Sequence, residues 1–436
     1  MSNAPSPRRF PVAMSILAAA VFLLGIGVGT PVLHAQAEED AKPARCVILF
    51  IGDGMGPHQV EAARLYAGEP LVFERLPVQT SLATASADSE VTDSAAAATA
   101  LATGHRVNNG VLSRAMPGDG QPLTTALEIL AQQGKATGLV TSVPILHATP
   151  AAFAAHVEHR KEAQAIAQDY LTVTRPDLLL GSGGMGMELE DAADAGYTVV
   201  TTREELFSQQ AQQARRLWGL FGGGRLPYEY DAVSGSDDGF DKLPHLSELT
   251  RAALAFLERD PDGFFLMVEG GLIDWASHDN QIERAVLETI ELSRAVQVAL
   301  DWAKDRDDVL ILVTADHETG GLEILEDRGA RQFPEVSWST RGHTATPVPL
   351  YAWGRHASWA ADADESADVF DLLIGRRPQP RGQEPAVAKK NGQGSGEESA
   401  QEDAQESVQG DAQEDAEENG QENVQEDAEQ PAAAAP

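Results

Sequence analysis

Residues 46–56 read Cys-Val-Ile-Leu-Phe-Ile-Gly-Asp-Gly-Met-Gly. An apolar run of this length that ends in glycines is typical of a strand buried on both faces, as in a parallel sheet covered by helices. Asp53 leaves the carboxyl end of this strand between two glycines, which let the backbone turn sharply and let another group approach. The stretch therefore predicts an α/β fold with a carboxylate aimed into a crevice at the carboxyl edge of the sheet. An ordinary strand-to-helix turn is the alternative interpretation.

A second predicted strand, residues 136–142, leads into a short segment that contains His147, Thr149 and Pro150. Proline suits the first turn of a helix, so we expect His147 and Thr149 in the turn between strand and helix. The helix is predicted to run on to Arg160, about three turns along, from where its long side chain could reach a site.

Four other histidines are interpreted without a functional role. His156 and His159 belong to the same predicted helix as Arg160 and are expected to pack or to face solvent. His245 and His356 lie outside any cluster of ligand-type residues in the sequence.

The next apolar run, residues 264–268, is followed by Glu269. Asp274 and His278 come soon after, four positions apart, so one helical turn would place both on the same side. A carboxylate and an imidazole in that arrangement can hold one metal ion. The segment therefore predicts a metal site at another strand end.

Residues 309–313 form a further predicted strand, followed by the adjacent pair Asp316 and His317. His343 lies in the loop before the last predicted strand, residues 348–354. On its own, His343 would not indicate a function. Together with the other strand ends, it completes a set of carboxylates and imidazoles at one edge of the predicted sheet.

Residues 88–104 change from acidic and hydroxyl residues to an alanine-rich run at Ser94 and stop at Gly104. This pattern predicts a helix that begins at or near Ser94. The free N–H groups and the dipole at a helix N-terminus would stabilise a serine alkoxide or a phosphate bound to it. A buried helix capped by serine for structural reasons is the alternative.

In their order and spacing, these motifs resemble the alkaline phosphatase family over about residues 44–375. The resemblance rests on Gly-Asp53-Gly-Met-Gly, Thr-Asp-Ser94-Ala-Ala, Ala-Thr149-Pro-Ala-Ala with Arg160, Glu269 to His278, and Asp316-His317 with His343. It implies a three-layer α/β/α sandwich around a large, mostly parallel central sheet. It also implies hydrolysis of small phosphate monoesters through a phosphoserine formed on Ser94, with Arg160 clamping two phosphate oxygens.

The resemblance further implies two Zn²⁺ and one Mg²⁺ for each chain. The implied ligands are Asp274, His278 and His343 for one zinc, Asp53, Asp316 and His317 for the other, and Asp53, Thr149 and Glu269 for magnesium. Two positions depart from the best-known bacterial pattern. His147 stands where Asp is common and Trp275 where Lys is common, both just outside the ligand set, so the identity of the third metal stays open.

Composition limits the partners. The net charge of −35 argues against nucleic acid, which needs a basic face. The single Cys46 excludes an intramolecular disulfide framework and a thiolate zinc cluster, so metal ligands must be nitrogen and oxygen donors. A homodimer is possible, although segments that form extra surface domains in larger relatives look short here.

The chain ends are expected to lie outside the catalytic domain, residues 45–376. Residues 1–37 have the basic, apolar and Ala-x-Ala order of a signal peptide, which predicts export to the periplasm or the outside and no stable membrane span after cleavage. An uncleaved anchor is the alternative, and the choice between Sec and twin-arginine export stays open. Residues 38–44 would be a short linker. Residues 377–436 are predicted to be a disordered tail rich in Gln, Glu, Asp and Ala, with cation capture or surface attachment as the alternative role.

Two other functions compete with a phosphomonoesterase. A related enzyme that acts on phosphodiesters or sulfates is disfavoured by Arg160, because a doubly charged terminal phosphoryl group needs such a clamp more than a diester does. A non-catalytic cation-binding surface protein is disfavoured by the complete ligand set and by Ser94.

Overall fold

The computed structural model describes Met1, residues 42–235 and residues 242–379. The predicted signal peptide, most of the linker and nearly all of the acidic tail lie outside these residues. Within the described ranges, none of the helices combines the length and the apolar character that a membrane span requires.

The core of the fold is a nine-stranded sheet with the strand order β2-β13-β8-β1-β7-β3-β4-β6-β5. Its strands are β1 Cys46–Gly52, β2 Val78–Leu82, β3 Ala136–Pro144, β4 Leu178–Ser182, β5 Thr198–Val200, β6 Leu217–Leu220, β7 Phe264–Gly270, β8 Val309–Thr314 and β13 Val348–Gly354. All neighbouring pairs from β8 to β5 are parallel, and only β13 runs antiparallel to its neighbours β8 and β2. The prediction of a large, mostly parallel sheet is confirmed.

Two small antiparallel ribbons lie beside the main sheet. They consist of β9 Glu318–Thr319 paired with β12 His343–Thr344, and of β10 Leu322–Glu326 paired with β11 Glu335–Trp338. The first ribbon brings residues soon after Asp316 next to His343, although the two segments are far apart in the chain.

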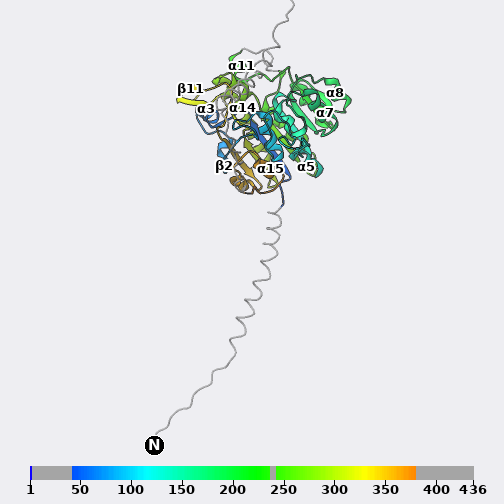
Figure 1. The fold of residues 1–436 in the computed structure, drawn as a ribbon, viewed down its shortest axis with the longest axis horizontal. Helices are drawn as coiled ribbons and strands as arrows, with labels where there is room; N and C mark the ends of the chain where they lie inside the picture. Colours follow the sequence, from blue (N-terminus) through cyan, green and yellow to red (C-terminus); the bar gives the residue numbers. More distant parts are fainter. Residues whose placement is uncertain (2–41, 236–241, 380–436) are drawn as a thin grey trace, which may run out of the picture. The chain divides into compact units, whose positions relative to one another are not determined.

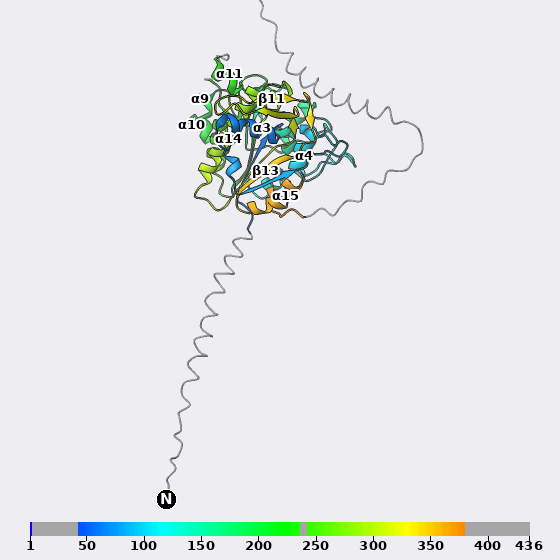
Figure 2. The ribbon, with the colours of Figure 1, turned by 90° about the vertical axis from the view of Figure 1, so that its left-hand side faces the viewer.

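Helices pack in two groups with the sheet between them (Figures 1 and 2). One group contains α3 Pro57–Ala67, α11 Glu229–Ser234, α12 Leu246–Leu257, α13 Leu272–His278 and α14 Ile282–Ala303. The other contains α4 Ser94–Thr103, α5 Ala126–Gln132, α6 Ala148–Ala154, α7 Ala163–Thr172 and α15 Asp368–Leu373. The remaining elements are α8 Leu189–Asp194, α9 Arg203–Leu206, α10 Gln209–Gln213, η1 Phe73–Arg75 and η3 Ala357–Asp362. This arrangement confirms the three-layer α/β/α sandwich.

Strands β1, β3, β7 and β8 are buried along their whole length. Their apolar and often β-branched or aromatic residues face helices on both sides, which explains the continuous apolar runs in the sequence. In β1 the register pairs Ile51 with Glu269 of β7 and with Thr314 of β8. The carboxyl ends of these three neighbouring strands therefore lie at the same height.

The helix predicted to reach Arg160 is shorter than expected. Helix α6 ends at Ala154, and the next residue, Ala155, takes an extended backbone. Val157 then pairs with Leu112 in an isolated bridge, and the backbone N–H of His156 donates to the Asp169 carboxylate. These interactions replace a further helical turn, so Arg160 comes from a loop.

Candidate active site

The candidate ligands gather at the carboxyl edge of the central strands. Asp53 follows β1, Glu269 lies within β7 near its end, and Asp316 follows β8. Because β1 lies between β8 and β7, these carboxylates meet at one point of the edge. This is where open α/β sheets bind ligands.

Three groups of donors have ligand atoms within 4.8 Å of one another. They are Asp274, His278 and His343; Asp53, Asp316 and His317; and Asp53, His147 and Glu269. The first two are the zinc ligand sets that the sequence predicted. The third differs, because it includes His147 alongside the predicted Asp53 and Glu269. The Asp53 carboxylate is shared by two groups.

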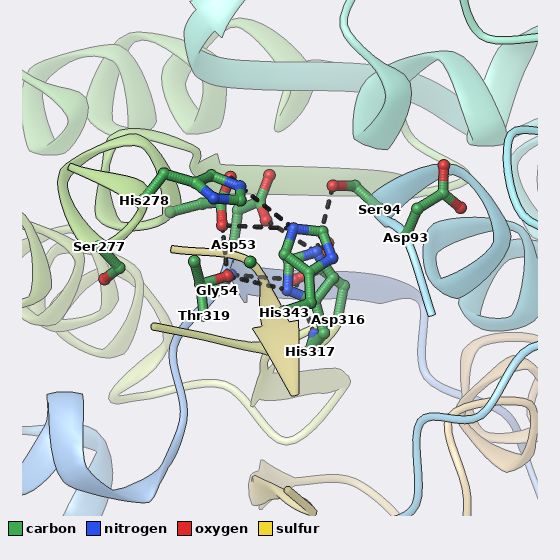
Figure 3. A network of polar contacts seen from close by, with 12 residues as sticks. Asp53, Gly54, Asp93, Ser94, Ser277, His278, Asp316, His317, Thr319 and His343 are labelled. Carbon is green, nitrogen blue, oxygen red and sulfur yellow. Dashed lines mark hydrogen bonds and ion pairs between the residues drawn. The ribbon is translucent and has the colours of Figure 1, made fainter. Parts of the chain in front are cut away.

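In the first group, His278 Nε2 lies 3.2 Å from Asp274 Oδ2 and 3.2 Å from His343 Nε2. In the second, His317 Nε2 lies 3.5 Å from Asp53 Oδ1 and 3.4 Å from Asp316 Oδ2. Figure 3 shows five of these side chains, those of Asp53, His278, Asp316, His317 and His343, converging on one centre. Their nitrogen and oxygen atoms form the kind of set that holds Zn²⁺.

Several buried oxygens at this edge have no hydrogen-bond partner among the described residues. They are both carboxylate oxygens of Asp53, Glu269 Oε1, Asp316 Oδ2 and Thr149 Oγ1. An unpaired buried polar atom costs about 1–3 kcal/mol, and a charged one costs more. Cations at these positions would remove that cost, so the residues fit the metals that the resemblance implied.

The electrostatics also indicate bound cations. Burial, followed by the charge of Asp316, raises the pKa of Asp53 well above its usual range. Burial and the charge of Asp274 raise the pKa of Asp316 to about 8. Burial also lowers the pKa of His317 well below its usual value. A bound metal ion would stabilise ionised carboxylates that otherwise repel one another. It would also bind the neutral form of the imidazole.

Ser94 is the first residue of α4, and it is 2% exposed. Its Oγ lies 3.1 Å from His317 Nε2, beside the second donor group (Figure 3). The N-cap is Asp93, whose side chain accepts a hydrogen bond from the Ala96 N–H at 2.9 Å. The alternative of a structural serine cap is therefore wrong, because Asp93 does the capping and leaves the Ser94 hydroxyl facing the ligands.

Arg160 approaches from its loop. Its Nη1 lies 3.4 Å from Asp93 Oδ2, and its Nη2 lies 3.1 Å from His147 Nε2. Asp93 Oδ2 also accepts the Gly110 N–H at 3.0 Å. Asp93 thus fixes both the start of the Ser94 helix and the guanidinium.

Sequence reasoning missed the role of Asp93, although an aspartate directly before a helix is a recognisable cap signal. It also missed Thr319, whose hydroxyl donates to Asp274 Oδ1 and lies 3.3 Å from His317 Nδ1. No local pattern marks Thr319, because its two partners belong to different segments.

The remaining histidines have varied surroundings. Trp275 lies edge-on to His147, with ring centroids 6.0 Å apart, so these two unusual residues are neighbours. His156 is held by Glu128 and by the Ser113 carbonyl, as expected of a packing residue. The expectation that His245 lies outside any cluster is wrong, because the fold brings it together with Glu229 and Glu291 from other helices.

Comparison with known proteins identifies the family. The family model described as alkaline phosphatase matches residues 44–184 and 181–334. Alkaline phosphatase 3 of Bacillus subtilis (strain 168) is 37% identical over 325 residues, which cover 69% of this chain and 68% of that protein. Streptomycin-6-phosphate phosphatase of Streptomyces griseus is 31% identical, with 82% of this chain and 96% of that protein covered.

Solved structures give the same result. A cold-active alkaline phosphatase from a psychrophilic Shewanella species superposes with a TM-score of 0.68 and 29% identity, covering 76% of this chain and 98% of the other. The enzyme of the Antarctic bacterium TAB5 superposes with a TM-score of 0.67 and 28% identity, covering 77% and 98%. The residues matched by the family model include Ser94 and every predicted metal ligand except His343. This chain therefore belongs to the alkaline phosphatase family.

Proposed function

We propose that this metal-dependent phosphomonoesterase forms its phosphoserine on Ser94. The observation that carries the proposal is the position of the Ser94 hydroxyl, which lies at the start of α4 and 3.1 Å from His317 at the edge of the ligand groups. There the free N–H groups of the helix favour negative charge on the serine oxygen and on a bound phosphate.

For the metals, we propose one Zn²⁺ in the group Asp274, His278 and His343 and another in the group Asp53, Asp316 and His317. We propose Mg²⁺ between Asp53, Thr149 and Glu269. When bound, such ions lower the pKa of a hydroxyl group or water and stabilise charge on the leaving oxygen. The ligand types at this third site also suit Zn²⁺, because the His147 imidazole lies beside the Asp53 and Glu269 carboxylates. A TAB5 variant in which a histidine is replaced by aspartate holds Mg in the site called M3.

Ser94 and Arg160 have different roles in the proposed reaction. The Ser94 oxygen attacks phosphorus, a new Ser–O–P bond forms, and the bond from phosphorus to the alcohol oxygen breaks, so that the alcohol leaves and takes up a proton. Water then cleaves the Ser–O–P bond and releases inorganic phosphate. Arg160 would hold two phosphate oxygens with its planar fork, while Asp93 and His147 keep the guanidinium in place.

The substrate class follows from the same fork. A terminal phosphoryl group offers Arg160 two charged oxygens, whereas a diester carries one charge and a second bulky substituent. We therefore propose small phosphomonoesters as substrates, and we expect the ratio of aryl phosphate to aryl phosphodiester turnover to separate this enzyme from a diesterase. We also propose export after cleavage behind Ala37, which N-terminal sequencing of the mature protein tests.

Trapping the phosphoenzyme tests the role of Ser94. Acid-quenched enzyme exposed to labelled phosphate should carry label on Ser94, and Ser94→Ala should lose the label and on the order of 10³-fold or more of turnover while keeping its metals. Ser277→Ala is the control, because Ser277 is equally buried in neighbouring α13 but donates its hydroxyl to the Ile273 carbonyl. Label that persists in Ser94→Ala would contradict the assignment.

A further inference from the structure

A second group of buried acids lies away from the active-site ligands, where α11, α12 and α14 meet. It consists of Glu229, the first residue of α11, His245, the residue before α12, and Glu288 and Glu291 on α14. We call these four residues the helix-junction cluster. The three glutamates are 8%, 6% and 2% exposed, in that order. Charged side chains are rarely so buried unless a partner compensates them.

The cluster has donor geometry that suits a metal ion. Glu229, His245 and Glu291 each offer a ligand atom within 4.8 Å of the others. His245 Nδ1 lies 2.7 Å from Glu229 Oε1. Glu229, His245, Glu288 and Glu291 all line one cavity of about 10 Å³, which is room for a single water molecule or ion.

Few cations are in direct contact with the acids of the cluster. Arg294 Nη1 lies 3.1 Å from Glu291 Oε2 and 4.0 Å from Glu229 Oε2, but Arg294 is 58% exposed and so is largely solvated. His245, if protonated, would add a second cation in direct contact, and Arg225 acts on Glu288 from beyond ion-pair distance. Burial and the charge of Glu229 raise the pKa of Glu288, so a proton is the other way in which the cluster can be neutralised.

Glu288 supplies an observation independent of the cluster's composition. Its Oε1 accepts the Glu229 N–H at 2.7 Å and so caps α11. This hydrogen bond uses Oε1 alone, and the side chain also lines the cavity, so Oε2 is not needed for capping. Glu291 shows the contrast, because its two oxygens accept the Ser247 N–H at 2.9 Å and contact Arg294. Glu288 can therefore cap α11 with one oxygen and offer the other to an ion in the cavity.

We propose that the helix-junction cluster binds one divalent transition-metal ion, with Zn²⁺ as the best match, and that this ion has a structural role. A mixed set of imidazole and carboxylate donors favours Zn²⁺ over Ca²⁺ or Mg²⁺, which prefer oxygen alone. Leu226, Pro227 and Leu272 also line the cavity, and its volume of about 10 Å³ is too small for a substrate. The ion would join three helices that otherwise meet through mutually repelling acids.

The position of the cavity links it to the active site. Ser142 lines the cavity, and its Oγ accepts the N–H of Leu272, the first residue of α13, at 3.3 Å. Helix α13 carries Asp274 and His278. The proposed ion therefore supports the base of a helix that bears active-site ligands, without contacting them.

Zinc counting tests the proposal in the whole enzyme. The protein is stripped with a chelator, reloaded with Zn²⁺ in excess Mg²⁺, freed of unbound metal and analysed by elemental mass spectrometry. His245→Thr is the informative variant, because threonine removes the imidazole but remains a favourable N-cap for α12. Asp301→Asn is the matched control, since it removes a charge from the exposed face of the same helix α14.

We expect His245→Thr to retain about one zinc fewer per chain than the wild type and the control, while it still forms the phosphoenzyme. Zinc should also raise the melting temperature of this variant by less than it raises that of the wild type. Equal zinc counts in the three proteins would overturn the proposal and leave protonation as the way in which the acids are neutralised. If His245→Thr does not fold, Glu291→Gln replaces it, since the amide oxygen can still accept the Ser247 N–H. Anomalous diffraction from zinc-loaded wild-type crystals decides independently: a peak at the cluster supports the site, and its absence overturns it.

Discussion

The active-site ligands and the helix-junction cluster both bury several acids beside histidine, yet the chain builds them differently. At the active site, Asp53, Glu269 and Asp316 lie at the ends of neighbouring parallel strands, so the register of the sheet sets their spacing. In the helix-junction cluster, the carboxylates start or cap helices that meet at an angle. Glu288 and Glu291 each give one oxygen to a helix N–H group.

This difference corresponds to the two roles that we propose, a catalytic role for the strand-edge site and a structural role for the helix-junction cluster. The strand-edge acids keep four buried carboxylate oxygens without hydrogen-bond partners among the described residues, and Ser94 and Arg160 approach the same point. A metal held there has room for substrate. Two of the helix acids each use one oxygen to accept a backbone N–H, and together the acids line a cavity of about 10 Å³. A metal ion in the helix-junction cluster would therefore have only a structural role.

The largest contrast between the two sites should appear with Asp53→Asn. This carboxylate is shared by two ligand groups, so its loss should empty both and lower turnover by about 10³-fold or more. Glu291→Gln should instead cost only the helix-junction zinc and leave the phosphoenzyme intact. Metal counts on both variants provide the measurement, and the loss of a single ion from Asp53→Asn would contradict the shared role.

The sequence predicted the strand-edge site because each ligand follows an apolar run or a short motif. Asp53, Glu269 and Asp316 could be placed by strand ends alone, and a parallel sheet then brings them together. The helix-junction cluster could not be predicted in this way. His245 and Glu291 stand in different helices with 45 intervening residues, and only the crossing of α12 and α14 makes them neighbours.

The same reasoning explains the error at Arg160. Sequence favoured a continuous helix after Pro150, because alanine-rich segments have high helix propensity. The chain leaves the helix at Ala155 because long-range contacts of the following residues, the bridge from Val157 to Leu112 among them, replace the local hydrogen bonds. Local propensity is a weak guide where tertiary contacts compete.

Changing the third donor group should alter metal preference rather than abolish binding. His147→Asp would replace an imidazole next to Asp53 and Glu269 with a hard oxygen donor, which favours Mg²⁺. We expect magnesium to bind on the order of 10-fold to 100-fold more tightly, by analogy with changes beside a metal ligand. Magnesium titration of the zinc-loaded enzyme measures this. An unchanged midpoint would show that His147 does not face the third ion.

Trp275→Lys should have a smaller effect. A charge pair at about 4 Å contributes on the order of 1 kcal/mol in water and roughly 4 kcal/mol at an effective dielectric of 20. A lysine beside His147 should therefore tighten phosphate inhibition by about tenfold, lower the maximal rate if product release limits it, and do so less at high salt. The inhibition constant and zinc content are measured together. Unchanged inhibition with zinc retained would contradict the electrostatic account. Zinc loss would show that Trp275 instead packs to hold the turn of α13 that carries Asp274 and His278.

The smallest effect concerns a half-buried contact between Glu128 and His156. It tests whether a pair of one acid and one histidine is enough to bind a metal. His156 Nε2 lies 3.3 Å from Glu128 Oε1, and His156 Nδ1 lies 2.9 Å from the Ser113 carbonyl oxygen. Glu128 Oε2 accepts the Thr125 N–H at 2.9 Å. Every donor and acceptor in this pair is thus used by the protein, so we expect Glu128→Gln to leave the zinc count unchanged.

The pair should instead affect stability within a defined pH range. Burial alone would lower the pKa of His156, but the hydrogen bond to Glu128 raises it above 6.5. Burial would raise the pKa of Glu128, but the hydrogen bonds from His156 and Thr125 lower it below 4.5. The stabilisation is therefore fully present between these two ordinary values, is lost at higher pH as His156 gives up its proton, and is lost at lower pH as Glu128 gains one.

Glu128→Gln keeps the capping box at the start of α5, because glutamine also suits that position. Denaturant unfolding of metal-free protein should show a loss of about 1 kcal/mol near pH 6 that shrinks towards zero at pH 9. Glu158→Gln, at an exposed glutamate, should show no such dependence, and an equal loss for Glu128→Gln at both pH values would mean that the contact is not an ion pair.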